Sequence, residues 1–441
     1  MATGMPHLNP QATDSELLHN LRLAIVDYYL KESNPQNGLV ADKNEPGSAA
    51  SIAAVGMGLS VYVVAVERRV VSRTDAVDRI LALLRFLHSA PQGPEPTATG
   101  YKGFYYHFLD MQTGLRVFEC ELSTVDTAIM MAGILTAATY FTAHNEKEIE
   151  LRKLADILYR RVDWQWALHG DMTITHGWKP ESGFLPYRWA TGYSEAIILY
   201  VLALGSPAFP INPQGYKEWI ATFEWKKIYN IEYLYAGPLF IHQMSHLWLD
   251  FRGIRDDFNR KVGIDYFENS RRATLVHRQY GIENPLRFAH YGEYGWGFTA
   301  SDGPGPAMVK VNGVNRTFFG YEARGAPFGP DDGTISPWAV ATSVPFAPEL
   351  VIKTIRRIVE RLTSLGCNPY GGFVASFNPT YPDDSKLHAW MSPWVFGLNE
   401  GPILMMIENY HSELIWKTIK RCPYIVNGLH RAGFRGGWVG S

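Results

Sequence analysis

Along this chain, helical segments that are apolar on every side alternate with helical segments that carry charge on one side. Ser51–Val66 contains no charged residue and Ser123–Phe141 contains one, whereas Thr74–His88 and Glu146–Val162 each combine apolar residues at helical spacing with many charges. A helix that is apolar all round is buried on every side, and a helix with one apolar stripe faces the core on that side only. The alternation therefore predicts an all-α fold in which an inner layer of helices is surrounded by an outer layer.

Helical periodicity recurs from end to end, with long segments between the helices that are rich in Gly, Pro and aromatic residues. The further predicted helices are Asp14–Lys31, Tyr193–Leu204, Leu239–Arg252, Tyr266–Tyr280, Pro348–Leu362 and Pro402–Trp416. The long segments are Ala90–Glu119, Gly170–Thr191, Asn284–Ser336 and Gly366–Asn399, with strand-like pieces at Gly103–Phe108 and Thr173–Trp178. Long structured loops on a scaffold usually carry function. No low-complexity linker divides the chain, so we expect one catalytic domain over residues 1–441, with 1–12 as a flexible extension.

Composition and charge exclude several classes of protein. Hydrophobic residues make up 46% of the 441 residues, which is enough to bury a large core and excludes general disorder. The formal charge is 41 − 43 = −2, so the chain has no overall field that would hold nucleic acid or an anionic membrane. The three cysteines contain no CxxC pair, and we interpret Cys120, Cys367 and Cys422 as structural thiols.

The uncharged stretch Ala49–Val66 approaches the length that spans a bilayer. It is rich in small residues and is followed directly by Glu67, Arg68 and Arg69, which favours a buried helix over a membrane helix. The first twenty residues show no signal peptide, so the expected location is the cytoplasm. Removal of an N-terminal segment would instead make the periplasm or the exterior possible.

Carboxylates cluster beside two of the apolar helices. Glu119, Glu121 and Asp126 surround the start of Ser123–Phe141, where Ser123 and Asp126 fit a capping box. Glu195 stands at the start of the apolar run that follows Gly192. A carboxyl in a partly dry pocket has a raised pKa, as a general acid requires, although a charge in the first turn of a helix is an equally simple reading.

His242, His246 and Asp250 are spaced i, i+4, i+8 and would share one face of a helix. Two histidines one turn apart can bind zinc, but Gln243 stands where an HExxH site has its glutamate. A metal site, a buried polar network and the lining of a polar groove all remain open. We expect no metal and no cofactor.

Aromatic residues form 13% of the chain, and several lie in loops beside acidic and basic side chains. In Tyr291–Phe298, Gly alternates with aromatic residues, which suits a loop that exposes ring faces. No Ser nucleophile elbow is present and Cys120 has no histidine context, so acyl transfer fits poorly. Separated carboxylates among aromatic residues suit cleavage of a glycosidic bond, in which one acid protonates the leaving oxygen and a second carboxylate activates water or attacks.

At this point the sequence resembles the bacterial glycoamylase-like proteins, which include endo- and exo-acting β-1,2-glucanases. The matching stretches are Gly103–Asp110, Glu121–Thr127, Gly192–Ala196, Gly237–His246, Asp250–Asp256, Glu268–Thr274, Tyr291–Glu293, Ala300–Gly305, Ala323–Pro327, Asp331–Ile335, Pro345–Glu349 and Ile407–Tyr410. They follow one another over most of the chain and are specific as a set.

The resemblance implies an (α/α)6 barrel and a metal-free, inverting hydrolysis of β-1,2-glucan or its oligosaccharides. It implies that Glu195 is the general acid, and we rank the candidates for the base as Asp126, Glu121 and Glu400. The expected substrate-binding residues are Phe104, Tyr105, His107, Trp178, Tyr193, His242, His246, Trp248, Arg252, Arg255, Glu293, Trp296, Asp302, Arg324 and Trp394.

One departure from the family pattern concerns chemistry, because Asn399 stands where relatives more often have aspartate. If that aspartate is the base in relatives, Glu400 would have to replace it here. Two alternatives therefore stay open: an enzyme that hydrolyses or transglycosylates another glucan, and a glucan-binding protein without catalysis.

Overall fold

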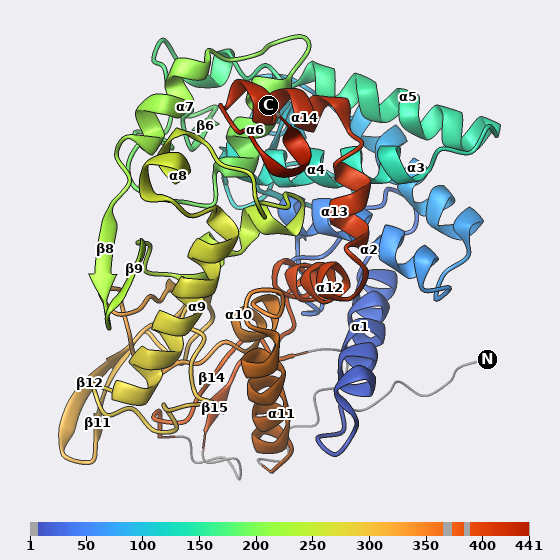
Figure 1. Cartoon of the computed structure of the whole chain (residues 1–441). Helices are drawn as coiled ribbons and strands as arrows, with labels where there is room; N and C mark the ends of the chain where they lie inside the picture. Colours follow the sequence, from blue (N-terminus) through green and yellow to red (C-terminus); the bar gives the residue numbers. More distant parts are fainter. Residues whose placement is uncertain (1–7, 365–372, 383–388, 441) are drawn as a thin grey trace. The chain divides into compact units, whose positions relative to one another are not determined.

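The computed structural model describes residues 8–364, 373–382 and 389–440, and it divides into two units built from segments that are distant in sequence. The first unit comprises Met1–Tyr28, Glu224–Met244 and Phe267–His411, and the second comprises Tyr29–Phe223, Ser245–Tyr266 and Ser412–Ser441. The described residues form 14 α-helices and several short antiparallel sheets, which confirms the mostly helical prediction (Figure 1). Cys367 lies outside the described residues, and Cys120 and Cys422 are buried thiols.

The second unit contains the predicted alternation of apolar and charged helices. Helices α2 (Ile52–Glu67) and α4 (Thr124–Tyr140) are almost wholly buried, and they touch where Gly56 meets Gly133. A Cβ atom on Gly133 would lie 2.0 Å from the carbonyl oxygen of Gly56, so a side chain there would force the two helices apart.

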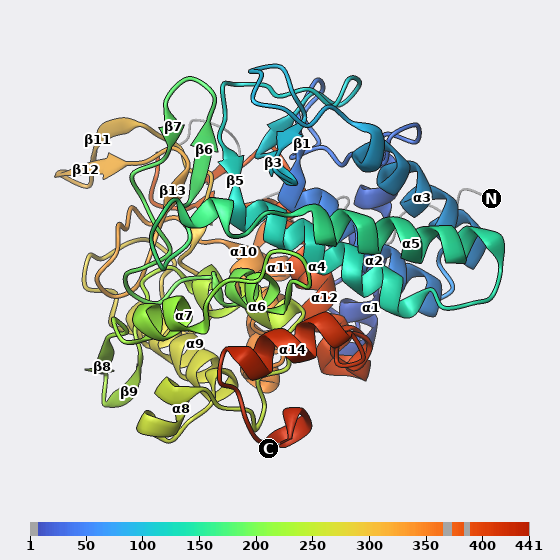
Figure 2. The same ribbon diagram turned by 90° about the horizontal axis from the view of Figure 1, so that it is seen from above.

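The more polar helices of this unit pack against neighbouring helices. Helix α3 (Arg73–Ser89) packs beside α5 (Glu146–Arg161), and α14 (Pro423–Arg431) packs beside the apolar α6 (Ile197–Gly205) (Figure 2). All residues of α6 are buried.

A five-stranded antiparallel sheet in the second unit has the order β2-β3-β5-β6-β7. Its strands are β2 (Gly100–Tyr101), β3 (Phe104–Tyr106), β5 (Leu122–Ser123), β6 (Gly177–Lys179) and β7 (Gly183–Phe184). A separate pair is formed by β1 (Ala50–Ser51) and β4 (Phe108–Leu109). Because β1 and β5 lead directly into α2 and α4, these pairings fix where the two buried helices begin.

The first unit combines helices with short antiparallel strand pairs (Figure 1). Its helices are α1 (Asp14–Lys31), which runs on into the second unit, α9 (Tyr266–Glu283), α10 (Pro337–Thr342), α11 (Pro348–Ser364) and α12 (Gly397–Ser412). Its strand pairs are β8 (Trp225–Ile228) with β9 (Ile231–Leu234), β10 (Ala300–Ser301) with β13 (Glu322–Ala323), β11 (Ala307–Val311) with β12 (Val314–Phe318), and β14 (Phe377–Asn378) with β15 (Trp390–Met391).

Three helix predictions were wrong in a way that affects the site. Leu239–Arg252 is not an α-helix but holds two single-turn 3-10 helices, Leu239–His242 and Met244–Leu247. The side chains of Gln243 and Ser245 bond to backbone groups of other segments, which competes with regular helical pairing. The argument that His242, His246 and Asp250 share a helix face therefore no longer holds.

The other two errors concern helix ends. Helix α6 begins at Ile197 instead of Tyr193, and the predicted Pro402–Trp416 helix is divided at Glu413 into α12 and α13 (Leu414–Ile419). Four short helices were not predicted: α7 (Pro213–Ile220), α8 (Asp257–Val262), α10 and α14. Three of these begin with proline, which sets the backbone angle of a first helical residue at no cost in hydrogen bonding.

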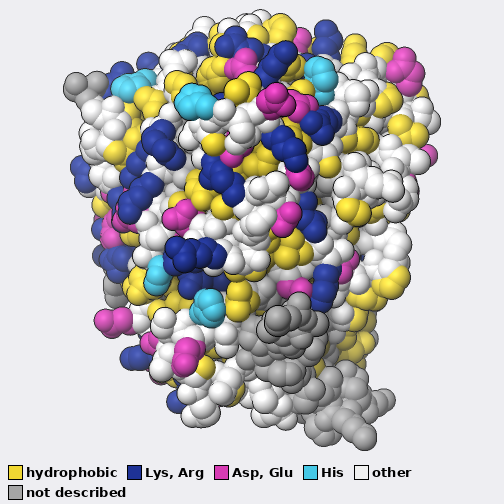
Figure 3. All heavy atoms as spheres, turned by 90° about the vertical axis from the view of Figure 1, so that its right-hand side faces the viewer, with side chains coloured by type: hydrophobic (Ala, Val, Ile, Leu, Met, Phe, Trp, Pro, Cys, Tyr) yellow, Lys and Arg dark blue, Asp and Glu magenta, His cyan; other side chains and the backbone are white. Residues whose placement is uncertain are grey.

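The uncharged stretch Ala49–Val66 contains the core helix α2, in which every residue from Ile52 to Ala65 is buried. Among the described residues, no helix is long and apolar enough to cross a membrane. On the face shown in Figure 3, Lys and Arg side chains are interspersed with Asp and Glu side chains.

Candidate active site

Strand register brings a histidine and a glutamate together at the end of β3 and the start of β5, two neighbouring strands of the five-stranded sheet. Tyr106 of β3 is paired with Leu122 of β5, so the next residues along the ladder, His107 and Glu121, face each other. The His107 amide donates to the Glu121 carbonyl oxygen at 2.9 Å, and ring atom Nδ1 lies 3.0 Å from Glu121 Oε1. Two residues that are 14 positions apart in sequence are thus held in direct contact.

Asp126 completes this cluster from the first turn of α4. Ser123 caps that helix by accepting from the Asp126 amide at 3.2 Å, as predicted, but the Asp126 carboxylate is turned toward His107. Asp126 Oδ2 lies 3.6 Å from His107 Nε2, an ion-pair distance, and the Asp126 side chain is 12% exposed. The Asp126 carboxylate, which the sequence suggested for a capping box, therefore has His107 as its partner.

Ionisation in this cluster follows from the contacts. Burial lowers the pKa of His107, but the charge of Asp126 and the hydrogen bond and charge of Glu121 outweigh it and raise the pKa to about 9. The hydrogen bond from His107 lowers the pKa of Glu121 against the effect of burial. At neutral pH the cluster therefore contains a cation between carboxylates.

Glu195 lies in a turn two residues before α6, and Ser245 fixes its backbone. The Ser245 hydroxyl donates to the Glu195 carbonyl oxygen at 2.8 Å and accepts from the Ile198 amide at 3.1 Å. Burial, reinforced by the negative charge of Asp126, raises the pKa of Glu195 from 4.5 to about 7. Glu195 is thus protonated over much of the range in which Glu121 is ionised.

Two of the aromatic residues predicted to bind substrate, Tyr193 and Trp178, pack against other rings of the second unit. Tyr193, two residues before Glu195, stacks on Tyr266 with ring centroids 5.8 Å apart. Trp178 is half-buried on β6, next to Tyr101 and Trp166. Tyr193 is only 6% exposed, so protein covers most of its ring, whereas part of Trp178 stays accessible to a ligand.

Several residues predicted to bind substrate are fully buried, and their contacts are with protein. In the second unit, Phe104, Tyr105, His246 and Trp248 are at most 1% exposed, and Tyr105 and Trp248 donate hydrogen bonds to Leu87 and Ser60. Substrate binding by these four stays a prediction, and packing is the role that their surroundings support.

The same is true of His242, Trp296 and Arg324 in the first unit. His242 is bonded to the Ala236 carbonyl oxygen, and burial lowers its pKa to about 4, so this ring is neutral. Arg324 is 0% exposed and forms a bidentate ion pair with Asp332 at 2.7 and 2.8 Å. Its position is that of a structural ion pair.

The other predicted residues are wholly or partly accessible. Arg252 donates to both oxygens of Asp250 and to Glu413, and Arg255 is exposed. In the first unit Glu293 is exposed and paired with Arg278, while half-buried Asp302 accepts a hydrogen bond from Ser392 at 2.9 Å. Trp394 is half-buried.

Glu400 differs from the other candidate bases. It lies in the first turn of α12, fully buried, and among the described residues neither carboxyl oxygen has a hydrogen-bond partner of good geometry. Burial raises its pKa well above the usual 4.5 and outweighs the opposing effect of the Phe373 backbone. A protonated carboxyl cannot accept a proton, so this environment argues against Glu400 as a general base.

The sequence model of the glycoamylase family, described as "Putative glucoamylase", matches residues 186–423, which is more than half of the chain. The chain belongs to the glycoamylase family. The match includes Glu195 and the Glu400 segment, while Asp126 and His107 lie before it.

Solved structures support this assignment over almost the whole chain. A Bacteroides uniformis protein with the same description is 31% identical, with a TM-score of 0.85 over 97% of this chain and 99% of that one. An endo-β-1,2-glucanase from Chitinophaga pinensis, solved with sophorotriose and glucose, is 26% identical, with a TM-score of 0.83 over 97% of this chain and 100% of that one. The mostly helical fold with short antiparallel sheets is therefore shared with known glycoamylase-family structures.

A curated relative has an established activity. It is the exo β-1,2-glucooligosaccharide sophorohydrolase (non-reducing end) of Parabacteroides distasonis, 29% identical over 453 aligned residues. The alignment covers 95% of this glycoamylase-family chain and 58% of the relative, so the chain spans less than two thirds of that protein's length.

The sequence analysis missed residues that position the site. Ser245 lies inside a motif that attracted attention only for its histidines, yet it anchors the Glu195 backbone. Asp42 adds a third negative charge near His107, and no motif in the loop before β1 marks it. Asp256 accepts hydrogen bonds from Tyr216 and Tyr266 at 2.8 Å each and thereby supports the ring on which Tyr193 stacks.

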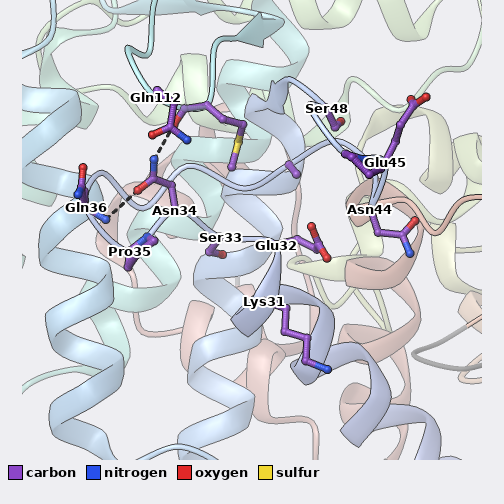
Figure 4. Close-up of a pocket in the computed structure, with 14 residues that line it drawn as sticks. Lys31, Glu32, Ser33, Asn34, Pro35, Gln36, Asn44, Glu45, Ser48 and Gln112 are labelled. Carbon is purple, nitrogen blue, oxygen red and sulfur yellow. Dashed lines mark hydrogen bonds between the residues drawn. The ribbon is translucent and has the colours of Figure 1, made fainter.

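A large surface pocket of the second unit lies apart from the predicted residues. Its volume is about 570 Å³, and its lining is mostly amide, hydroxyl and carboxylate groups from the loop between α1 and β1 and from Met111 and Gln112 (Figure 4). None of the predicted catalytic or substrate-binding residues lines it.

Proposed function

We propose that this protein is a glycoside hydrolase that cleaves β-1,2-glucan or β-1,2-glucooligosaccharides. The observation that carries the proposal is the buried Glu195, whose pKa burial and, to a smaller extent, the nearby Asp126 raise to about 7. A carboxyl group with a raised pKa is what the role of general acid requires, and a second carboxylate close by is what the role of base requires. The activities named for the C. pinensis and P. distasonis relatives supply the substrate class.

In the proposed reaction Glu195 protonates the glycosidic oxygen while Asp126 accepts a proton from the attacking water. Asp126 is favoured over Glu121 because Glu121 Oε1 is already engaged by His107 at the shorter distance, 3.0 Å against 3.6 Å. Asp126 is favoured over Glu400 because burial keeps Glu400 protonated.

We also propose that the helices close into an (α/α)6 barrel. The alternation of apolar and charged helices supports this arrangement, as does the similarity to glycoamylase-family structures over 97% of the chain. A crystal structure of the protein would test the closure directly.

The decisive experiment is an assay of the purified protein against linear and cyclic glucans of different linkage. Release of reducing sugar or of sophorose from linear β-1,2-glucan is the expected result. If sugar is released only from another glucan, that glucan is the substrate and not β-1,2-glucan. Binding without release would indicate a glucan-binding protein.

Hydrolysis should not depend on a metal ion. Among the described residues no group of three or more His, Cys, Asp or Glu side chains could hold one, and the proposed mechanism needs only carboxyl groups and water. Activity is expected to be unchanged after dialysis against EDTA. Loss of activity that only added zinc restores would contradict the prediction.

The first product should appear with inverted anomeric configuration. An inverting mechanism requires room for water between acid and base, with the carboxyl groups roughly 6.5–9.5 Å apart. NMR of a reaction stopped before mutarotation should show the α-anomer at the newly formed reducing end. An initial β-anomer would indicate retention and a covalent intermediate.

A further inference from the structure

Both ring nitrogens of His107 face carboxylate oxygens. Nδ1 lies 3.0 Å from Glu121 Oε1, and Nε2 lies 3.6 Å from Asp126 Oδ2. A neutral imidazole has one N–H and one lone pair, so one of these two contacts would set a lone pair against a carboxylate. Only the imidazolium form, with an N–H on each nitrogen, is attracted to both neighbours.

Backbone bonds hold His107 in place, and one face of its ring is packed. The His107 amide donates to the Glu121 carbonyl oxygen at 2.9 Å, and the His107 carbonyl oxygen accepts from the Ile52 amide at 3.2 Å. The imidazole stacks on Phe108, with ring centroids 4.1 Å apart and an angle of 11° between the planes. The backbone bonds fix where the His107 Cα lies, and a ring turned away from the carboxylates would lose the stacking on Phe108 and both carboxylate contacts.

Three segments of the chain place negative side chains around His107. Glu121 comes from the start of β5, Asp126 from α4, and Asp42 from the loop before β1, and all three favour a positive ring. Lys179 of β6 adds a positive charge that, like His107, lowers the pKa of Glu121. Within the second unit, three negative groups thus surround His107, which is only 33% exposed.

We propose that His107 is a positioning residue that stays an imidazolium and holds Glu121 and Asp126 as carboxylates on either side of its ring. Its role in catalysis rests on the proposed hydrolase function, whereas its charge state does not. The imidazolium offsets the cost of keeping two partly buried carboxylates ionised together. Asp126 then remains available as a base, and its charge adds to the burial that raises the pKa of Glu195 to about 7.

The charge state is tested by NMR titration of the histidine ring resonances in the free protein. The His107 signals, assigned with the variant His107→Asn, should keep the imidazolium shift through neutral pH and titrate near pH 9. Glu121→Gln and Asp126→Asn should each lower that midpoint by about one pH unit or more. A His107 ring that loses its proton near or below neutral pH in the unaltered protein overturns the proposal, and that measurement needs no variant to fold beyond the one used for assignment.

The catalytic consequence is tested by the pH profile of kcat/KM on the glucan that the protein hydrolyses. In His107→Asn the acidic limb should move to higher pH by about one unit, because Asp126 and Glu121 then compete for ionisation without a cation between them. At acidic pH this corresponds to roughly a tenfold loss of kcat/KM. An unchanged acidic limb in a folded His107→Asn variant overturns the proposal, since a purely structural role would not move it.

His169 provides the matched control. It is an exposed histidine of the same unit, stacked on Phe184 and away from the carboxylate cluster. His169→Asn should leave both the His107 midpoint and the pH profile unchanged. If no glucan is hydrolysed, the proposed function fails while the NMR titration still decides the charge state of His107.

Discussion

Glu195→Gln is expected to lose about 10²–10⁴-fold in turnover while it still binds glucan, because glutamine keeps the shape of the side chain but supplies no proton. The measurements are initial rates on the hydrolysed glucan and calorimetric titration with an oligosaccharide. The control is Glu218→Gln, a change of the same kind at an exposed glutamate of α7, which should leave both values unaltered. A Glu195→Gln protein that retains more than a tenth of the turnover would exclude Glu195 as the general acid.

The same substitution should make the folded protein more stable at alkaline pH. Below about pH 4.5 the carboxyl is protonated in both the folded and the unfolded state, so glutamine changes little there. Between pH 4.5 and about 7 the unfolded chain ionises first, and above pH 7 the folded state carries the full cost of a charged Glu195. Thermal unfolding at about pH 8 should therefore show a higher melting temperature for Glu195→Gln, with a gain of at most about 3 kcal/mol.

A gain in stability together with a loss of turnover would separate the two readings that the sequence left open for Glu195. A charge in the first turn of a helix would be a stabilising group, and its removal would cost roughly 0.3–1 kcal/mol with turnover almost unchanged. The two readings thus predict opposite signs for the change in melting temperature at alkaline pH.

Helices with a strong pattern could be predicted from the sequence. Asp14–Lys31 is found with the predicted bounds, and α2, α3, α4, α5, α9 and α11 differ from prediction by a few residues at their ends. Where the helix predictions were wrong, tertiary contacts or short helix length outweighed the local sequence pattern. In Leu239–Arg252 the side chains of Gln243 and Ser245 bond to other segments instead of following the local helical pattern, and short helices such as α7 lack the length that reveals periodicity.

The site could be predicted only in part, because the sequence shows which residue types are present but not which side chains contact one another. Glu195, Asp126 and Glu121 stood out as carboxylates beside apolar runs. That His107 lies between two of them depends on the register of β3 against β5, which no local signal in the sequence determines. The same limit applies to Arg324, which stands among glycines and aromatic residues as if exposed but is fully buried against Asp332.

Arg324 gives the largest expected effect on stability. Besides Asp332, its guanidinium donates to the carbonyl oxygens of Ser301 and Gly320, so one side chain joins the segments around β10, β12 and β13. Arg324→Met leaves Asp332 as a buried charge without its cation. Removing one partner of a buried ion pair costs about 3–5 kcal/mol, because the remaining charge has lost its water and its counterion.

Thermal unfolding should therefore show a melting temperature several degrees lower for Arg324→Met. Arg357→Met is the matched control, since Arg357 pairs with Glu360 on the surface of α11 at 2.7 Å and is 59% exposed, and such pairs contribute about 0–1 kcal/mol. Adding Asp332→Asn to Arg324→Met removes the unpaired charge and should recover part of the lost stability. If Arg324 instead bound substrate, Arg324→Met would raise KM with little change in melting temperature, and Asp332→Asn would recover nothing.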